Sequence, residues 1–99
     1  MNITKTYDEK KLTISVEGEI DTVTAPDFQN ELIDEMGKFD SLVFDFKNLE
    51  YISSAGLGVL IATQKKLKGL DIPFEIINTP DSIKEIFSVT GLEKILNFQ

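Results

Sequence analysis

Tyr51-Ile52-Ser53-Ser54-Ala55-Gly56-Leu57-Gly58-Val59-Leu60 is the stretch that decides the fold of this chain. It follows an apolar run, Leu42-Val43-Phe44-Asp45-Phe46, and precedes a helical pattern that ends in lysines. Two serines and two glycines therefore lie where a strand is expected to give way to a helix. A helix start has unpaired backbone N–H groups and the positive end of the helix dipole, and both suit a phosphate. Because serine can itself carry that phosphate, the stretch is a candidate switch.

Strand-like and helix-like patterns alternate on both sides of this stretch. Period-two alternation and short apolar runs predict strands at residues 3–6, 12–16, 42–46, 74–77 and 95–98. Helical spacing with start and stop signals predicts helices at residues 24–37, 54–69 and 80–91, the first with Thr24 as its N-cap. The order β-β-α-β-α-β-α-β predicts an α/β fold, in which one mixed β-sheet packs against helices.

Two predicted loops, residues 18–23 and 48–54, follow strands whose carboxyl ends meet at one edge of the sheet. Ligands of such folds bind at that edge. Asp21 and Ser54 are therefore expected to be near neighbours.

The composition excludes several classes of function. The 99 residues include no cysteine and no histidine, which removes disulfides, thiolate metal sites, a Ser-His-Asp triad and most zinc sites. The serines match no G-x-S-x-G elbow, and the glycines match no dinucleotide or Walker loop. The net charge of −7 disfavours nucleic acid and anionic lipid. We expect a cytoplasmic protein that is not an enzyme and holds no metal or cofactor.

Each residue of the candidate site also has a purely structural explanation. Ser53 and Ser54 are both good helix N-caps. Gly56 and Gly58 are unfavourable in a helix, so they are expected to allow close approach of a neighbouring element or of a partner. Asp21 is a common turn former before a helix. Position alone leaves these alternatives open.

At these residues the chain resembles the STAS domain, as found in bacterial anti-sigma factor antagonists. Leu49-Glu50-Tyr51-Ile52-Ser53-Ser54-Ala55-Gly56-Leu57-Gly58 is similar to the family signature. Gly18-Glu19-Ile20-Asp21, the run at residues 42–46 and Thr90-Gly91-Leu92 resemble other landmarks of the family. The resemblance covers essentially the whole chain and implies one STAS domain at residues 1–99.

The resemblance implies a partner-switching function. The unphosphorylated antagonist binds an anti-sigma factor that is also a serine kinase, and a sigma factor is released for transcription. The kinase then phosphorylates the antagonist, and a PP2C-type phosphatase resets it. The phosphoacceptor position of the motif falls on Ser54. The position before it is often Asp in the family but is Ser53 here, so Ser53 is the runner-up. The alternative is a STAS scaffold, or a subunit of a stress-signalling or lipid-transport complex, in which Ser54 is only a cap.

The expected partner-binding surface combines the loop at residues 18–23 with the start of the second helix. Its residues are Asp21, Thr22, Ser53, Ser54, Ala55, Gly56, Leu57 and Gly58. The free protein is expected to be a monomer that binds neither nucleic acid nor membrane.

Overall fold

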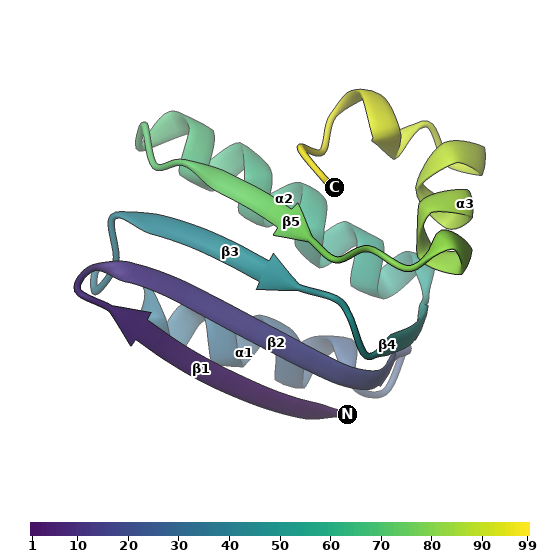
Figure 1. Ribbon diagram of the computed structural model, residues 1–99, viewed down its shortest axis with the longest axis horizontal. Coiled ribbons are helices and arrows are strands. Elements are labelled where there is room, and N and C mark those ends of the chain that lie inside the picture. Colours follow the sequence, from purple (N-terminus) through teal and green to yellow (C-terminus); the bar gives the residue numbers. More distant parts are fainter.

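Strand β2 (Lys11–Ile20) is the central element of the fold, because three other strands pair with it. The computed structural model describes residues 1–99, and Figure 1 shows the sheet in the order β1-β2-β3-β5. Strand β1 (Asn2–Asp8) runs antiparallel to β2, whereas β3 (Ser41–Asp45) runs parallel to the first half of β2. The short strand β4 (Leu49–Ile52) pairs with the last residues of β2, and β5 (Phe74–Ile77) pairs with β3.

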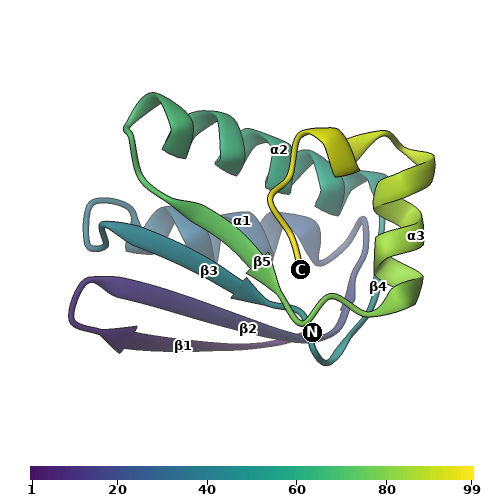
Figure 2. The ribbon, with the colours of Figure 1, turned by 45° about the horizontal axis from the view of Figure 1, so that its top comes forward.

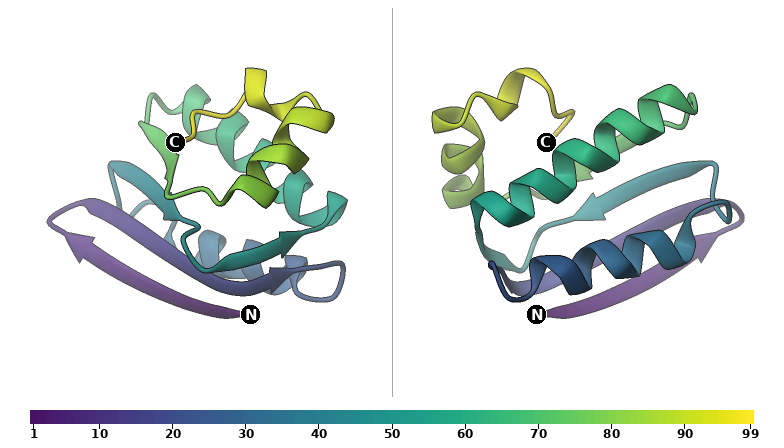
Figure 3. Two further views of the ribbon diagram at one scale, coloured as in Figure 1. Left: turned by 45° about the vertical axis from the view of Figure 1, so that its right-hand side comes forward. Right: turned by 180° about the vertical axis from the view of Figure 1, so that it is seen from behind.

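The helices follow the parallel strands and cover one face of the sheet. Helices α1 (Ala25–Glu35) and α2 (Ser54–Gly69) lie side by side on that face (Figure 3). Helix α3 (Asp81–Val89) packs beside β4 at the end of the sheet, as Figure 2 shows. A 3₁₀ helix, η1 (Leu92–Lys94), follows it. None of these helices has the length and apolar character needed to cross a membrane.

The core lies between the sheet and the helices and is rich in phenylalanine. Phe28, Phe44, Phe46 and Phe87 are fully buried, and the rings of Phe28 and Phe44 have centroids 5.4 Å apart. Leu12, Ile14 and Val16 alternate along β2 and point into this core, as their spacing predicts.

The predicted class, a mixed sheet packed against helices, is confirmed, but three predicted boundaries are wrong. Residues 49–52, expected in a loop, form β4, and residues 18–20, also expected in a loop, are the end of β2. The last predicted strand, at residues 95–98, is absent except for Phe98, which bridges to Ile76. The observed order is therefore β-β-α-β-β-α-β-α, followed by η1.

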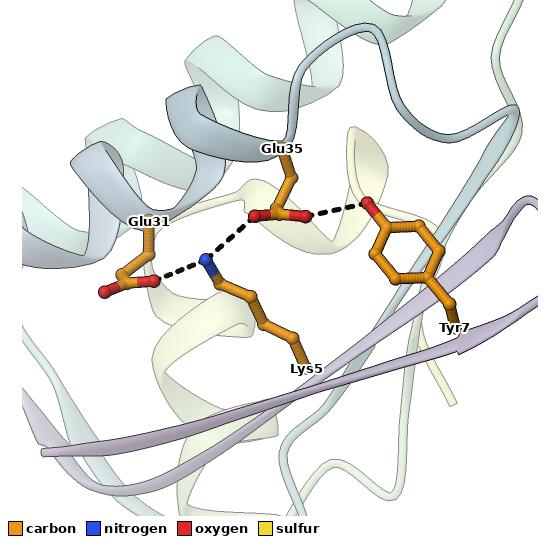
Figure 4. Close-up of polar contacts among 4 residues, drawn as sticks. All are labelled: Lys5, Tyr7, Glu31 and Glu35. Carbon is orange, nitrogen blue, oxygen red and sulfur yellow. Dashed lines mark hydrogen bonds and ion pairs between the residues drawn. The ribbon is translucent and has the colours of Figure 1, made fainter.

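A polar cluster on the edge strand attaches β1 to α1 (Figure 4). Lys5 Nζ lies 2.5 Å from Glu31 and 3.1 Å from Glu35, and the Tyr7 hydroxyl donates to the other oxygen of Glu35 over 2.8 Å. These hydrogen bonds, that from Tyr7 first, lower the pKa of Glu35, while the bond to Glu31 is the main cause that raises the pKa of Lys5. The cluster therefore fixes the position of α1 along the sheet.

Candidate functional site

The pairing of β2 with β4 brings the two segments of the predicted site together. Ile20 pairs with Ile52, and the Ser53 N–H donates to the Ile20 carbonyl over 2.8 Å. The residues that follow the two strands, Asp21 and Ser53, therefore leave the same edge of the sheet. This is the arrangement that the carboxyl-end rule predicts for two parallel strands.

The two serines of the motif have opposite environments. Ser53 is the N-cap of α2: its Oγ accepts a hydrogen bond from the Gly56 N–H over 3.2 Å, and the residue is only 8% exposed. Ser54 is the first residue of the helix, and it is exposed. The alternative in which Ser54 is only a cap is not supported, because the capping position belongs to Ser53.

The start of α2 keeps two backbone donors available. Of the first four N–H groups of the helix, that of Gly56 bonds to Ser53 Oγ and that of Leu57 bonds to the Ser53 carbonyl. The N–H groups of Ser54 and Ala55 have no intrahelical partner by geometry. No acidic residue lies in the first turn, so the positive end of the helix dipole is not compensated by the chain itself.

Gly56 and Leu57, which the sequence analysis places in the partner-binding surface, are both buried. A Cβ atom on Gly56 would lie 2.7 Å from Ile52 Cγ1 and 2.8 Å from Ile20 Cγ2. The glycine exists for close packing of α2 against the ends of β2 and β4. Of the two alternatives open for Gly56, the geometry favours close approach of a neighbouring element over contact with a partner.

Gly58 differs from Gly56 in every respect that matters for binding. It is exposed, and a Cβ atom there would meet nothing within 4 Å. Ala55, one turn earlier, is also exposed. The accessible surface of the first turns of α2 is therefore made by Ser54, Ala55 and Gly58.

Asp21 organises the turn that leads into α1. Its Oδ1 accepts hydrogen bonds from the N–H groups of Val23 and Thr24, each at 2.9 Å, and Thr24 Oγ1 accepts the Asp21 N–H at 2.8 Å. These reciprocal hydrogen bonds between Asp21 and Thr24 have the geometry of a capping box, and they lie in the turn just before α1. Thr24, predicted as the cap, makes no such bond to the helix and instead serves as the partner of Asp21.

The same hydrogen bonds keep Asp21 ionised. The bond from the Thr24 N–H, followed by that from the Thr24 hydroxyl, lowers the pKa of the Asp21 carboxyl. The site therefore combines a fixed negative charge on one loop with the positive start of α2 on the other.

Two exposed apolar residues lie next to predicted site residues in the chain: Val23 belongs to the predicted loop at residues 18–23 but was not singled out there, and Tyr51 was not predicted. Val23, in the loop after β2, is 80% exposed, and Tyr51, on β4, is 46% exposed. Thr22, which was predicted, is exposed between Asp21 and Val23 in the loop after β2. A β-branched apolar residue in a loop was the only signal for Val23, and nothing in the sequence indicated which face of β4 carries Tyr51.

The comparisons with known proteins agree with this geometry. The family model of the STAS domain matches residues 2–99. The chain belongs to the STAS domain family. Its relatives include the anti-sigma-B factor antagonist of Staphylococcus aureus strain NCTC 8325 / PS 47, which is 31% identical over 99 residues. That match covers 98% of this chain and 91% of the relative.

Solved STAS structures share the fold. The crystal structure of an anti-sigma factor antagonist from Mycobacterium paratuberculosis is 28% identical with a TM-score of 0.88, covering 98% of this chain and 83% of that one. The unphosphorylated form of the anti-sigma factor antagonist SpoIIAA has a TM-score of 0.82 at 15% identity, covering 99% and 88%. At that identity the SpoIIAA likeness shows the fold alone.

Proposed function

We propose that this STAS domain is an anti-sigma factor antagonist that is switched by phosphorylation of Ser54. In its unmodified form it binds an anti-sigma factor with serine kinase activity, and this binding frees a sigma factor for transcription in the cytoplasm. The role is supported by the names of the relatives in Staphylococcus aureus and Mycobacterium paratuberculosis, which match nearly the whole chain. We propose a binding module and not a catalyst.

The proposal rests on the different environments of the two serines. Ser53 holds the cap and is buried, whereas Ser54 is exposed at the helix start. A kinase can therefore reach Ser54 without opening the helix. A phosphate on Ser54 adds about 1.5 to 2 negative charges next to the two available N–H groups and the uncompensated dipole, so the fold is expected to survive.

The proposed binding surface is a corrected version of the predicted one. It keeps Asp21, Thr22, Ser54, Ala55 and Gly58. It adds the apolar side chains of Val23 and Tyr51, and it assigns Ser53, Gly56 and Leu57 to the support beneath. An exposed glycine lowers the stability of a helix, and Gly58 has no close neighbour that would require a glycine. Close approach of a partner backbone to Gly58 is a physical reason for its presence.

Release follows from electrostatic repulsion at this surface. We propose that the bound kinase places carboxylates or the phosphates of ATP near Ser54. Like charges in a desolvated contact cost several kcal/mol, which is enough to change the affinity by two or more orders of magnitude. A PP2C-type phosphatase would then restore the binding form.

The test is to map the acceptor directly. Incubation with a cognate anti-sigma kinase and ATP should add one phosphate, and peptide mass mapping should place it on Ser54. Ser54→Ala should abolish the modification, while Ser53→Ala should still be modified if it remains folded. Phosphate on Ser53 with Ser54 unmodified would overturn the assignment. Binding without any modification would favour the constitutive scaffold.

A further inference from the structure

The groove between α1 and α2 is the most apolar hollow on the molecule outside the candidate site. It has a volume of about 160 Å³, and six of the nine residues that line it are hydrophobic. Seen from behind, the two helices run side by side in the same direction across this face (Figure 3). The deepest lining residue, Leu67, belongs to the core, so the groove is a surface extension of that core.

Apolar side chains are exposed along the rim of the groove. Ile33 on α1 is 57% exposed, Ala62 on α2 is exposed, and Met36 is half-buried. Single exposed apolar residues are common on protein surfaces and need no explanation. Here they are continuous with a hollow between two parallel helices, which is the geometry that accepts an amphipathic helix.

The charge on the α2 side of the groove favours one kind of helix, whereas the α1 segment on the other side carries Asp27, Glu31, Asp34 and Glu35. The α2 segment contains no acidic residue, although the protein has a net charge of −7. Lys65, Lys66 and Lys68 are exposed, and none takes part in an ion pair, since the only ion pairs are those of Lys5. The helix dipole accounts for cations in the last turn. Lys66 lies in that last turn and is also the only charged residue among those that line the groove.

We propose that the α1–α2 groove docks an amphipathic helix of a protein partner, with acidic residues on the flank that faces Lys66. Its apolar stripe would cover Ile33, Met36 and Ala62. Lys66 lies twelve residues after Ser54, about 18 Å along the helix axis at 1.5 Å per residue. That distance is about twice the Debye length at physiological ionic strength. Docking here is therefore independent of the phosphorylation state of Ser54.

The test uses a designed peptide and needs no anti-sigma factor. The probe is an 18-residue helical peptide with leucines at i, i+3, i+4 and i+7 spacing and glutamates along its flank. The control peptide has glutamine in place of each glutamate. Amide shift perturbations in ¹⁵N NMR spectra should map the acidic peptide to α1 and the second half of α2, and leave Asp21 and Ser54 unchanged. The acidic peptide should bind about five-fold more tightly or better at low salt, and the difference should shrink at high salt.

Protein variants make the result specific. Ile33→Gln should weaken binding by about ten-fold or more, since the apolar contact is lost. Lys66→Gln should remove the preference for the acidic peptide. The control is Val89→Gln on α3, which changes a side chain that is 77% exposed and lies outside the groove, and it should have no effect.

Three outcomes would overturn the proposal. One is failure of the acidic peptide to bind, or equal binding of both peptides, because the net charge of the protein opposes an acidic ligand unless Lys66 attracts it. Another is sensitivity to Val89→Gln as great as to Ile33→Gln. The third is a dimer of the protein alone that Ile33→Gln dissociates in sedimentation experiments, which would identify a second copy as the occupant of the groove.

Discussion

Ser53 and Ser54 are neighbours in the chain, yet burial and hydrogen bonding give them different tasks. Ser53 Oγ satisfies the N–H of Gly56 inside the structure, and Ser54 presents its hydroxyl at the surface. At the scale of the residue, one serine maintains the helix start and its neighbour remains available for chemistry. Sequence position could not separate them, because both residue types and both positions suit a cap.

This division predicts different stabilities for two alanine variants. Ser53→Ala should lower the free energy of unfolding by about 1 to 2 kcal/mol, since it removes a cap and leaves the buried N–H of Gly56 without a partner. Ser54→Ala should change it by less than about 0.5 kcal/mol. Urea denaturation of both variants measures the difference. A larger loss for Ser54→Ala would show that the capping role has been assigned to the wrong serine.

Asp21 predicts a pH dependence whose sign follows from its lowered pKa. The folded state favours the carboxylate, so this contribution to stability is fully present above the ordinary pKa of an aspartate and is lost as the pH falls through the lower folded-state value. Asp21→Asn keeps an oxygen acceptor but removes the charge. The stability gap between wild type and Asp21→Asn should therefore be constant near neutral pH and should close below about pH 4. A gap that does not change with pH would contradict the assigned hydrogen bonds.

At the scale of the element, β4 is the strand that sequence patterns could not reveal. Gly18 pairs with Leu49, but Glu19 pairs with Tyr51, so Glu50 is an extra residue that forms a bulge. Leu49 and Ile52 are buried while Glu50 and Tyr51 are exposed, which breaks the alternation of period two. Strands β1 and β2 alternate with a period of two, and β3 and β5 are short apolar runs, so these strands could be predicted. The three helices could be predicted from their helical spacing and their start and stop signals.

In the candidate site, too, features set by neighbouring residues could be predicted, whereas features set by contacts between distant residues could not. The helix start, the two serines and the Asp21 turn carry local signals and could be predicted. Burial of Gly56 could not, because it depends on Ile20 and Ile52, and Ile20 is distant in the chain. Sequence patterns report propensity, whereas contact between distant residues decides which glycine packs and which is accessible.

The two glycines of α2 give opposite predictions for the same substitution. Gly56→Ala should destabilise the protein by about 1 to 2 kcal/mol, because the added methyl overpacks stiff isoleucine side chains and outweighs the gain in helix propensity. Gly58→Ala should stabilise it by about 0.5 to 1 kcal/mol, since the new methyl enters open space in a helix. Thermal melts of the pair decide the point. Equal shifts, or a stable Gly56→Ala, would show that Gly56 is not a packing residue.

At the scale of the whole molecule, the two proposed binding faces share helix α2. The end of β2 and β4 supports the Ser54 surface, and the α1–α2 groove lies farther along the same helix. The proposed phosphorylation of Ser54 would act on charge at the start of α2, so it would change recognition without requiring the domain to refold. The central claim is therefore an electrostatic switch on a constant structure.

The most direct test of that claim is the affinity of a cognate anti-sigma kinase for the unmodified protein and for the protein phosphorylated on Ser54. Isothermal titration at low salt should show binding that is weaker by about 100-fold or more for the phosphorylated form. Its melting temperature should be equal to or higher than that of the unmodified protein, because the phosphate is placed at a helix N-terminus. Equal affinities under these conditions, where repulsion is least screened, would contradict the switch.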